Sequence, residues 1–406
     1  MSLDRADSDA RDRHRRGRER LRSAPENPVS KELDLMTHRS LWSHQGCESA
    51  LRAAHKEPQP APLPGASDAA RAWPMPRPGE LGCPQTSRAP RGPRPAHGAR
   101  WALVLAAGEG SRLRTLTTDE RGVAVPKQFC SLRGGPSLLE RTLARAEAVV
   151  PRERVVVVVA AEHAALWRPQ LAHLPPENIV VQPRNRGTAV GVMLPLCSIM
   201  QRDPDPNLIV LPSDHFVVDE ATLRRSLVAA SDVVEHGESG IILLGMQPTA
   251  ASSDLGWIVP ETRPSLLAAV EAFVEKPAPA VARQLMARGA MWNTFLVAAR
   301  GRTLLHLIDE GAPGLSRNLR DALQLGGDAL ERAYELLSTV DLSRHVFARS
   351  PHALRVATVP PCGWTDLGTP QRVRACLAER RDTPVVAIPH RGVTVRLDLR
   401  LQAIEA

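Results

Sequence analysis

Residues 154–160 read RVVVVVA, and this run constrains the fold more than any other feature of the chain. β-branched valines favour an extended backbone, and the run has no polar face. A strand of this kind is typical of a parallel sheet covered by helices on both faces. The chain is therefore expected to build a layered α/β domain around a central sheet.

Short apolar runs and amphipathic segments alternate on both sides of this strand. Further strands are expected at residues 102–107, 179–182 and 208–211, with helices at 137–150, 162–171 and 188–200. The first helix begins with Ser137 and Glu140, the S-x-x-E spacing of a capping box. The β-α-β-α-β order predicts a doubly wound α/β fold with a mostly parallel, Rossmann-like sheet.

The pattern continues with less regular spacing after residue 211. We expect helices at 220–235, within 303–337 and at 371–380, and strands at 241–246, around Trp257, and at 270–274, 292–298, 354–359 and 393–399. No internal repeat is present. One folded domain is therefore predicted over residues 100–381, followed by a short C-terminal extension over 382–406.

Residues 1–99 have a different composition. Residues 1–100 hold 18 Lys and Arg against 12 Asp and Glu, and a Pro-rich stretch over 58–95 contains few apolar side chains. Such a segment cannot bury enough surface to offset its ordering entropy. A disordered, Arg- and Pro-rich tail is predicted over residues 1–99.

Charge and apolar content exclude several classes of protein. Most of the formal net charge of +8 lies in the tail, so the nearly neutral body does not favour nucleic-acid binding. No apolar run approaches the roughly 18 residues of a membrane span, and the N-terminus lacks a signal-peptide core. The six cysteines form no C-x-x-C pair, which argues against a zinc site. We expect a cytoplasmic protein with neither nucleic-acid nor membrane partners.

Lysine is rare in this arginine-rich chain. Only four lysines occur, and Lys31 and Lys56 belong to the tail, which leaves Lys127 and Lys276 for the body. An ammonium is a compact point charge on a flexible stem, whereas a guanidinium is a planar fork. Phosphate sites often use the ammonium of lysine. Both body lysines are therefore candidates for binding phosphate.

The loop after the first strand reads Ala107-Gly108-Glu109-Gly110-Ser111-Arg112. Its backbone N–H groups could approach a phosphate, and Arg112 could neutralise one. Leu113 stands where a dinucleotide-binding fingerprint has its third glycine, and no G-K-[ST] of a Walker A loop follows. A nicotinamide-binding protein is therefore disfavoured, while an ordinary β–α turn stays open as the alternative.

Further motifs follow other predicted strands. Lys127 belongs to PKQF, and Asp214 follows the strand that ends in LPSDH. A carboxylate at that position could hold Mg²⁺, or it could cap a turn. Glu275 and Lys276 occur in VEKP, Asn293 follows Trp292, and Asp366 lies in WTDLG. Ligands gather at the carboxyl ends of strands in open α/β sheets, so these motifs are expected to meet there.

Taken in order, these motifs resemble those of the sugar-1-phosphate nucleotidyltransferases, most nearly the mannose-1-phosphate guanylyltransferases. The resemblance covers residues 101–380, which implies that the predicted domain is catalytic. Its implied nucleotide-binding residues are Leu105, Ala106, Ala107, Gly108, Glu109, Gly110, Ser111, Gln182, Gly187 and Thr188. Arg112, Lys127, Asp214 and Asp366 would be catalytic, with the two aspartates holding Mg²⁺. Gly256, Glu275, Lys276 and Asn293 would bind the sugar phosphate.

The reaction implied by this resemblance joins a nucleoside triphosphate, GTP by preference, to a hexose 1-phosphate such as mannose 1-phosphate. The chain departs from the guanylyltransferase pattern at Ala106 and Ala107, at Thr115, and at Phe295, where WNTF lacks the usual glycine. The segment QPRNRGTA mixes guanylyl and thymidylyl patterns. A uridylyl- or thymidylyltransferase acting on glucose 1-phosphate and a non-catalytic sugar-nucleotide-binding regulator are the alternatives. A homodimer is left open, and no long bifunctional form is expected.

Overall fold

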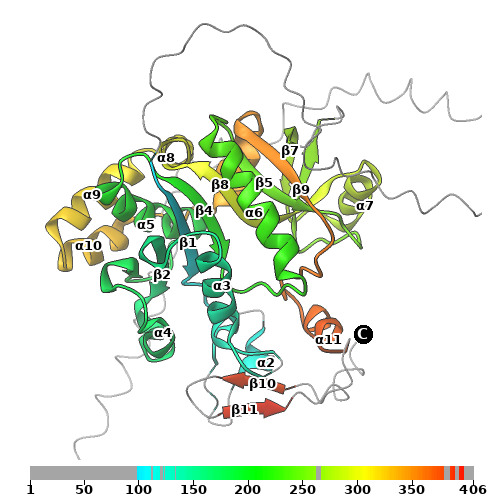
Figure 1. Ribbon diagram of the computed structural model, residues 1–406, viewed down its shortest axis with the longest axis horizontal. Helices are drawn as coiled ribbons and strands as arrows, with labels where there is room; N and C mark the ends of the chain where they lie inside the picture. The colour runs from blue at the N-terminus through cyan, green and yellow to red at the C-terminus, as the bar shows by residue number, and fades with distance from the viewer. Residues whose placement is uncertain are drawn as a thin grey trace, which may run out of the picture. The chain divides into compact units, whose positions relative to one another are not determined.

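The valine run forms the second strand of a nine-stranded sheet (Figure 1). The computed structural model describes residues 98–110, 113–118, 122, 124–132, 134–261, 267–378, 385–388 and 393–396, all within one compact unit, Arg88–Ala406. The predicted tail lies almost wholly outside these residues. The disorder of the tail stays a prediction. So does the division of the chain into residues 1–99, 100–381 and 382–406.

Four strands make the parallel half of the sheet. They are β1 (Arg100–Ala106), β2 (Val155–Ala160), β3 (Ile179–Gln182) and β4 (Asn207–Pro212), in the order β3-β2-β1-β4. Every residue of β2 and β4 is buried, as expected for strands covered on both faces. This part confirms the predicted Rossmann-like arrangement.

The other half of the sheet is mixed. It contains β5 (Ile241–Met246), β6 (Gly256–Pro260), β7 (Leu267–Glu275), β8 (Met291–Arg300) and β9 (Leu354–Val359). β8 lies antiparallel between β4 and β5, and β6 and β7 pair antiparallel, whereas β5 and β9 are parallel. The expectation of a mostly parallel sheet therefore needs correction here. An apolar run shows that a strand is buried but not the direction of its partner.

Helices cover both faces of the sheet. α3 (Leu138–Glu147) and α6 (Glu220–Glu235) lie across the face turned to the viewer in Figure 1 and pack their leucines into one hydrophobic cluster. α5 (Thr188–Arg202), α8 (Gly301–Gly311) and α9 (Leu315–Leu325) contribute to a second cluster. These two layers confirm the doubly wound α/β class. The predicted capping box is also present, since Ser137 and Glu140 exchange hydrogen bonds at the start of α3.

The remaining elements are shorter. They are α2 (Arg114–Thr117), α4 (Ala164–Leu171), α7 (Pro279–Ala287), α10 (Asp328–Leu336), α11 (Pro370–Ala378), and the hairpin strands β10 (Val385–Ile388) and β11 (Val393–Arg396). The predicted helical region 303–337 divides at Gly314 and at Gly326, both with positive φ. α7 had no counterpart in the sequence prediction.

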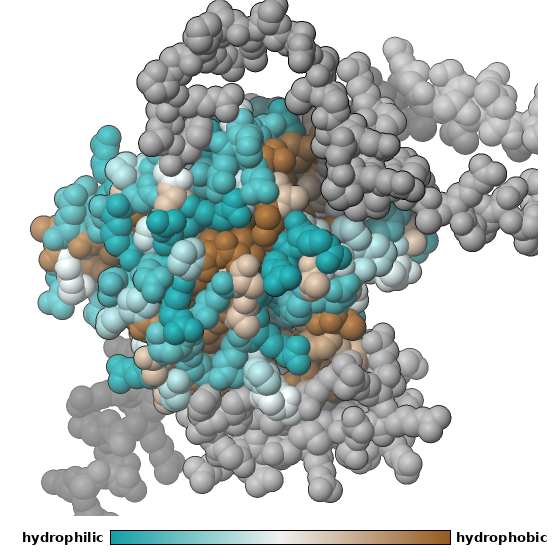
Figure 2. Space-filling view, viewed as in Figure 1, coloured by the Kyte–Doolittle hydropathy of each residue, from teal (hydrophilic) through white to brown (hydrophobic). Residues whose placement is uncertain are grey.

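The visible surface fits the amphipathic patterns of the helices. Hydrophilic residues make up most of the visible surface of the described domain, with smaller apolar patches between them (Figure 2). Among the described residues, no helix combines the length and apolar character needed to cross a bilayer.

Candidate active site

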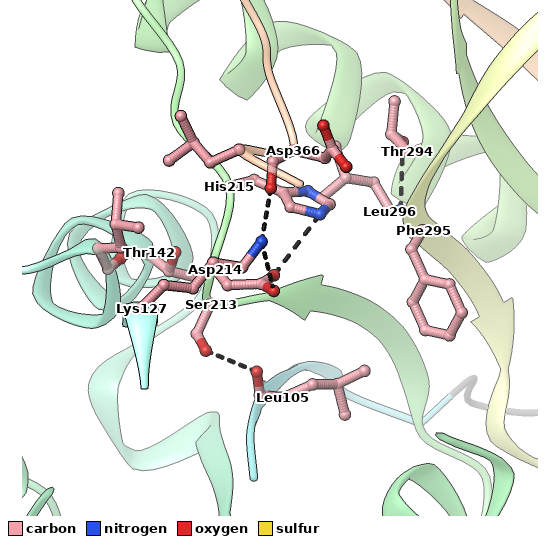
Figure 3. Close-up of polar contacts among 12 residues, drawn as sticks. Leu105, Lys127, Thr142, Ser213, Asp214, His215, Thr294, Phe295, Leu296 and Asp366 are labelled. Atoms are coloured by element: carbon pink, nitrogen blue, oxygen red, sulfur yellow. Dashed lines mark hydrogen bonds and ion pairs between the residues drawn. The ribbon is translucent and has the colours of Figure 1, made fainter. Parts of the chain in front are cut away.

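The carboxyl ends of β1 and β4 are joined by Ser213. Its backbone N–H and its hydroxyl both donate to the Leu105 carbonyl, at 3.1 and 2.6 Å (Figure 3). This contact places the start of the glycine loop beside the motif that carries Asp214. The two segments therefore meet as expected for neighbouring parallel strands.

The glycine loop packs directly against the PKQF motif. Gly110 has a φ of 64°, and a Cβ there would lie 3.1 Å from the backbone nitrogen of Lys127 and 3.1 Å from the Cα of Pro126. The Gln128 amide donates to the carbonyls of Ala106, at 3.2 Å, and Gly108, at 2.7 Å. The sequence did not single out Gln128, although it lies inside a predicted motif. Its buried amide fixes the shape of the loop.

The predicted site residues of the loop are only partly described. Leu105 and Gly108 line the cleft, whereas Ala106, Ala107, Glu109 and Gly110 are absent from its walls. Ser111 and Arg112 lie outside the described residues. The proposed contacts of Ser111 and Arg112 with phosphate stay predictions.

The two predicted magnesium ligands are brought together by a β-bridge. Phe216 and Thr365 form an isolated antiparallel bridge with two N–H···O bonds of 2.9 Å. Asp214 lies two residues before Phe216, and Asp366 follows Thr365 directly. Segments that are far apart in the sequence thus pair directly beside the two aspartates, which both line the cleft.

Lys127 lies between these aspartates. Its ammonium donates to the Asp366 carbonyl at 2.6 Å and contacts Asp214 Oδ2 at 3.1 Å (Figure 3). Burial alone would raise the pKa of Asp214, but Lys127 and then His215 outweigh it and hold that pKa below its usual value. Asp214 is therefore ionised at neutral pH. The two residues predicted to serve phosphate and metal are in direct contact.

The carboxylate of Asp366 has a different partner. Its Oδ1 accepts from Arg372 Nη1 at 2.6 Å, and Arg372 also donates to the hydroxyl of Ser252. Arg372 lies in the first turn of α11 and was not predicted as a site residue. No motif marked it, because its role depends on where α11 packs.

The site has the donors that Mg²⁺ prefers. Within the described part of the chain, no three His, Cys, Asp or Glu side chains gather closely enough to hold a metal ion. Two carboxylates do fit Mg²⁺, which usually adds water and substrate phosphate oxygens to one or two protein ligands. His215 lies beside Asp214, and burial lowers its pKa to about 4 while Asp214 opposes that shift.

The opposite wall is built from β6, β7 and β8. Gly256 is paired in register with Glu275, and a Cβ on Gly256 would lie 2.7 Å from Glu275 Oε2. Lys276 Nζ contacts Glu275 Oε1 at 3.1 Å. Burial raises the pKa of Glu275, and Lys276 partly opposes this rise. All four residues predicted to bind the sugar phosphate, including Asn293, line the same cleft.

Backbone strain is concentrated at this cleft. Among the described residues, the non-glycine residues with positive φ are Lys276 at 48°, Phe295 at 58° and Leu367 at 51°. Lys276 and Phe295 line the cleft, and Leu367 follows Asp366. Such conformations cost on the order of 1–3 kcal/mol each and persist where the surrounding structure imposes them, often at functional sites.

The predicted base-reading segment follows β3. Gln182 is buried, and its Oε1 has no hydrogen-bond partner among the described residues. Asn185 donates to Glu109 at 3.1 Å and so joins this segment to the glycine loop. Thr188 lines the cleft and accepts from the Leu342 N–H at 2.7 Å, whereas Gln182 and Gly187 are absent from its walls.

Gly187 is a position where only glycine fits. Its φ of 84° and ψ of 170° belong to a region almost restricted to glycine, and a Cβ would lie 2.4 Å from the Val340 carbonyl oxygen. We expect Gly187→Ala to lower the free energy of unfolding by about 1–3 kcal/mol or more in urea denaturation. Gly289→Ala is the control, because Gly289 has a φ of 76° but open space around it. Equal losses in both variants would contradict a role for the Val340 contact.

The cleft formed by these residues has a volume of about 280 Å³. Glycine-loop residues and Thr188 occupy one part, Asp214 and Asp366 another, and Gly256, Glu275, Lys276 and Asn293 a third. Asp341 and Ser343 also line it and were missed, because the short helix Leu342–Val346 that follows Asp341 showed no pattern in the sequence. Lys276 lines the cleft, whereas Lys127 is absent from its walls and is connected to it through its contacts with Asp214 and Asp366.

Comparisons with known proteins agree on one family. The family described as Nucleotidyl transferase matches residues 101–380. The xanthan biosynthesis protein XanB of Xanthomonas campestris pv. campestris is 30% identical over 281 residues, which cover 66% of this chain and 57% of XanB. The mannose-1-phosphate guanylyltransferase of Escherichia coli K12 is 28% identical over 285 residues, covering 66% of this chain and 58% of that enzyme. The chain thus spans little more than half the length of these curated relatives.

A solved structure shows the same relationship. The crystal structure titled mannose-1-phosphate geranyltransferase from Thermus thermophilus superposes with a TM-score of 0.58 and 30% sequence identity. The match covers 66% of this chain and 76% of that one. The likeness therefore extends over about two thirds of this chain.

Proposed function

The chain belongs to the nucleotidyl transferase family, and from this premise we propose that it transfers a nucleotidyl group from a nucleoside triphosphate to a hexose 1-phosphate, with release of pyrophosphate. One observation carries the proposal. Asp214 and Asp366 line a single cleft and both contact Lys127, and Lys276 lines the same cleft beside Glu275. One cation in the cleft and a second bound to its aspartates suit a reaction between two phosphate compounds.

The chemical obstacle is repulsion between two anions. A phosphate oxygen of the sugar phosphate forms a bond to the α-phosphorus while the bond to pyrophosphate breaks in line. Lys127 would contact the triphosphate, and Lys276 would contact the attacking phosphate. Cations that contact both phosphates stabilise the charge that develops. The attacking phosphate is ionised at neutral pH, so the residues need only bind and orient both substrates.

The proposal assigns Asp214 and Asp366 to a magnesium ion. When bound, Mg²⁺ supplies charge neutralisation on the phosphate oxygens. Asp214 is ionised and directed at the cleft, while Arg372 holds the Asp366 carboxylate. The Lys127 ammonium contacts Asp214 in this structure, so we infer that it exchanges this contact for substrate phosphate.

GTP and mannose 1-phosphate are the proposed substrates. Their support is the family, the guanylyl-like PKQF and PSDH motifs, and relatives such as the E. coli mannose-1-phosphate guanylyltransferase. We expect pyrophosphate release to be fastest with this pair across a panel of four nucleoside triphosphates and several hexose 1-phosphates. A tenfold or greater preference for dTTP or UTP would instead favour a thymidylyl- or uridylyltransferase acting on glucose 1-phosphate.

A non-catalytic sugar-nucleotide-binding regulator is less well supported. Such a protein has no need to keep both carboxylates and both lysines, whereas here Asp214, Asp366 and Lys276 line one cleft and Lys127 contacts Asp214. The same pyrophosphate assay distinguishes the two, because a regulator would bind sugar nucleotide without turnover. Cytoplasmic location and a homodimer stay predictions.

A further inference from the structure

Strand β8 contains an irregularity where it passes the cleft. Asn293 pairs with Gly245 and Val297 pairs with Leu243, so residues 294–296 lie opposite Leu244 alone. The Thr294 hydroxyl donates to the Leu244 carbonyl at 2.6 Å and accepts from the Leu296 N–H at 3.2 Å. Bulges of this kind redirect side chains next to active sites. The side chain redirected here is that of Phe295.

Phe295 adopts a conformation that glycine would adopt at no cost. Its φ is 58°, and its N–H donates to Asn293 Oδ1 at 3.1 Å. The guanylyltransferases that the motif resembles usually have glycine in this part of the motif. Keeping a bulky residue in a strained backbone is explained most simply if its ring has a use.

The ring belongs to an aromatic cluster beside the cleft. Phe295 contacts Phe347 with ring centroids 6.4 Å apart, and Phe347 contacts Phe273 at 5.8 Å. The chain has only five phenylalanines, and three of them are in this cluster. Phe347 is fully buried, whereas Phe295 is half-buried and lines the cleft. In Figure 3 the Phe295 ring extends from β8 on the side opposite to Thr294.

The position of this ring relative to the proposed sugar-phosphate residues suggests its role. Lys276, Glu275 and Asn293 supply charge and hydrogen bonds, and Phe295 adds an aromatic side chain on the same strand as Asn293. Trp364 also lines the cleft, but it packs against His215, next to Asp214. An aromatic face can contact the C–H groups of a hexose but cannot replace a hydrogen bond to a hydroxyl. A hexose hydroxyl directed at the ring would lose its hydrogen bond to water on binding and gain none in return.

We propose that Phe295 is a specificity-determining residue that selects among hexose 1-phosphates by packing its ring against an apolar face of the sugar. Epimers differ in which hydroxyl interrupts such a face, so the ring discriminates between them. The Phe347 contact keeps the ring in place, and the bulge hydrogen bonds keep the strained backbone in place. This inference rests on the proposed nucleotidyl transfer to a hexose 1-phosphate.

The test compares two epimers on wild type and Phe295→Gly. kcat/KM is measured for mannose 1-phosphate and glucose 1-phosphate with the same nucleotide, and their ratio is the readout. We expect Phe295→Gly to reduce the ratio tenfold or more, mainly through a higher KM for the preferred sugar phosphate, with the nucleotide KM changed less than twofold. Glycine suits a φ of 58°, and Asn293 keeps its bond to the backbone N–H, so the variant should fold.

Phe295→Leu tests whether selectivity needs the flat ring or only an apolar side chain of similar size. Leucine should reduce the ratio as well, because it cannot present a planar face. A ratio within twofold of wild type in Phe295→Gly, or a wild-type ratio in Phe295→Leu, would overturn the inference. Failure of the proposed function is distinguishable, because the wild type would then form no nucleotide sugar from any substrate pair.

Discussion

Replacing Asp214 with asparagine is expected to lower kcat/KM about a hundred- to a thousandfold, the range seen when one group that stabilises transition-state charge is removed. Asparagine keeps the shape of the side chain but removes its negative charge. It therefore weakens the proposed metal site and removes the charge of the Lys127–Asp214 ion pair, although the amide oxygen can still accept a hydrogen bond. Asp366→Asn should act in the same direction and also raise the Mg²⁺ concentration needed for half-maximal activity.

Two controls make this result specific. Asp321→Asn makes the same chemical change on an exposed residue of α9 and should keep wild-type kinetics. Thermal unfolding of Asp214→Asn should stay close to wild type, which separates lost chemistry from lost structure. Full activity of Asp214→Asn, or wild-type turnover that survives EDTA, would exclude the proposed metal-assisted mechanism.

Lys276→Arg is expected to damage the enzyme although it keeps the charge. Lys276 has a left-handed backbone and a 3.1 Å contact with Glu275, so the ammonium is held in a defined position in the cleft. A planar guanidinium is longer and needs different acceptor geometry. A charged hydrogen bond contributes about 1.5–3 kcal/mol, so a loss of about ten- to a hundredfold in kcat/KM is expected. The loss should appear mainly in the KM for the sugar phosphate.

A reverse exchange provides the matched control. Arg288 forms an exposed 2.9 Å ion pair with Glu271, and pairs of this kind contribute little. Arg288→Lys should therefore leave both Michaelis constants unchanged, while Lys276→Ala should be at least as damaging as Lys276→Arg. Wild-type constants for Lys276→Arg with both substrates would remove Lys276 from the proposed site.

Several helices and strands could be predicted from local pattern. β3, α6, β5 and β9 begin and end at the predicted residues, and the capping box starts α3 as expected. These elements are strongly marked because apolar periodicity and capping act over a few residues. α7 and Leu342–Val346 were not predicted; Leu342–Val346 spans only five residues, too few to show a period.

The sequence by itself determined which residues could carry the chemistry. Two lysines in an arginine-rich body and a carboxylate at a strand end indicated Lys127, Lys276 and Asp214 without coordinates, whereas Asp366 was assigned from the resemblance of WTDLG to a family motif. Position after a strand was informative for Asp214, because parallel strands bring their carboxyl ends to one edge of the sheet.

Only the tertiary structure decided how these residues interact. The Phe216–Thr365 bridge brings the aspartates together, and Lys127 lies between them. The packing of α11 brings Arg372 to Asp366, and the antiparallel insertion of β8 carries the bulge that turns Phe295 into the cleft. Each of these depends on contacts between distant segments. Local periodicity records whether a residue is buried, but it contains no information about the direction or identity of the partner that buries it.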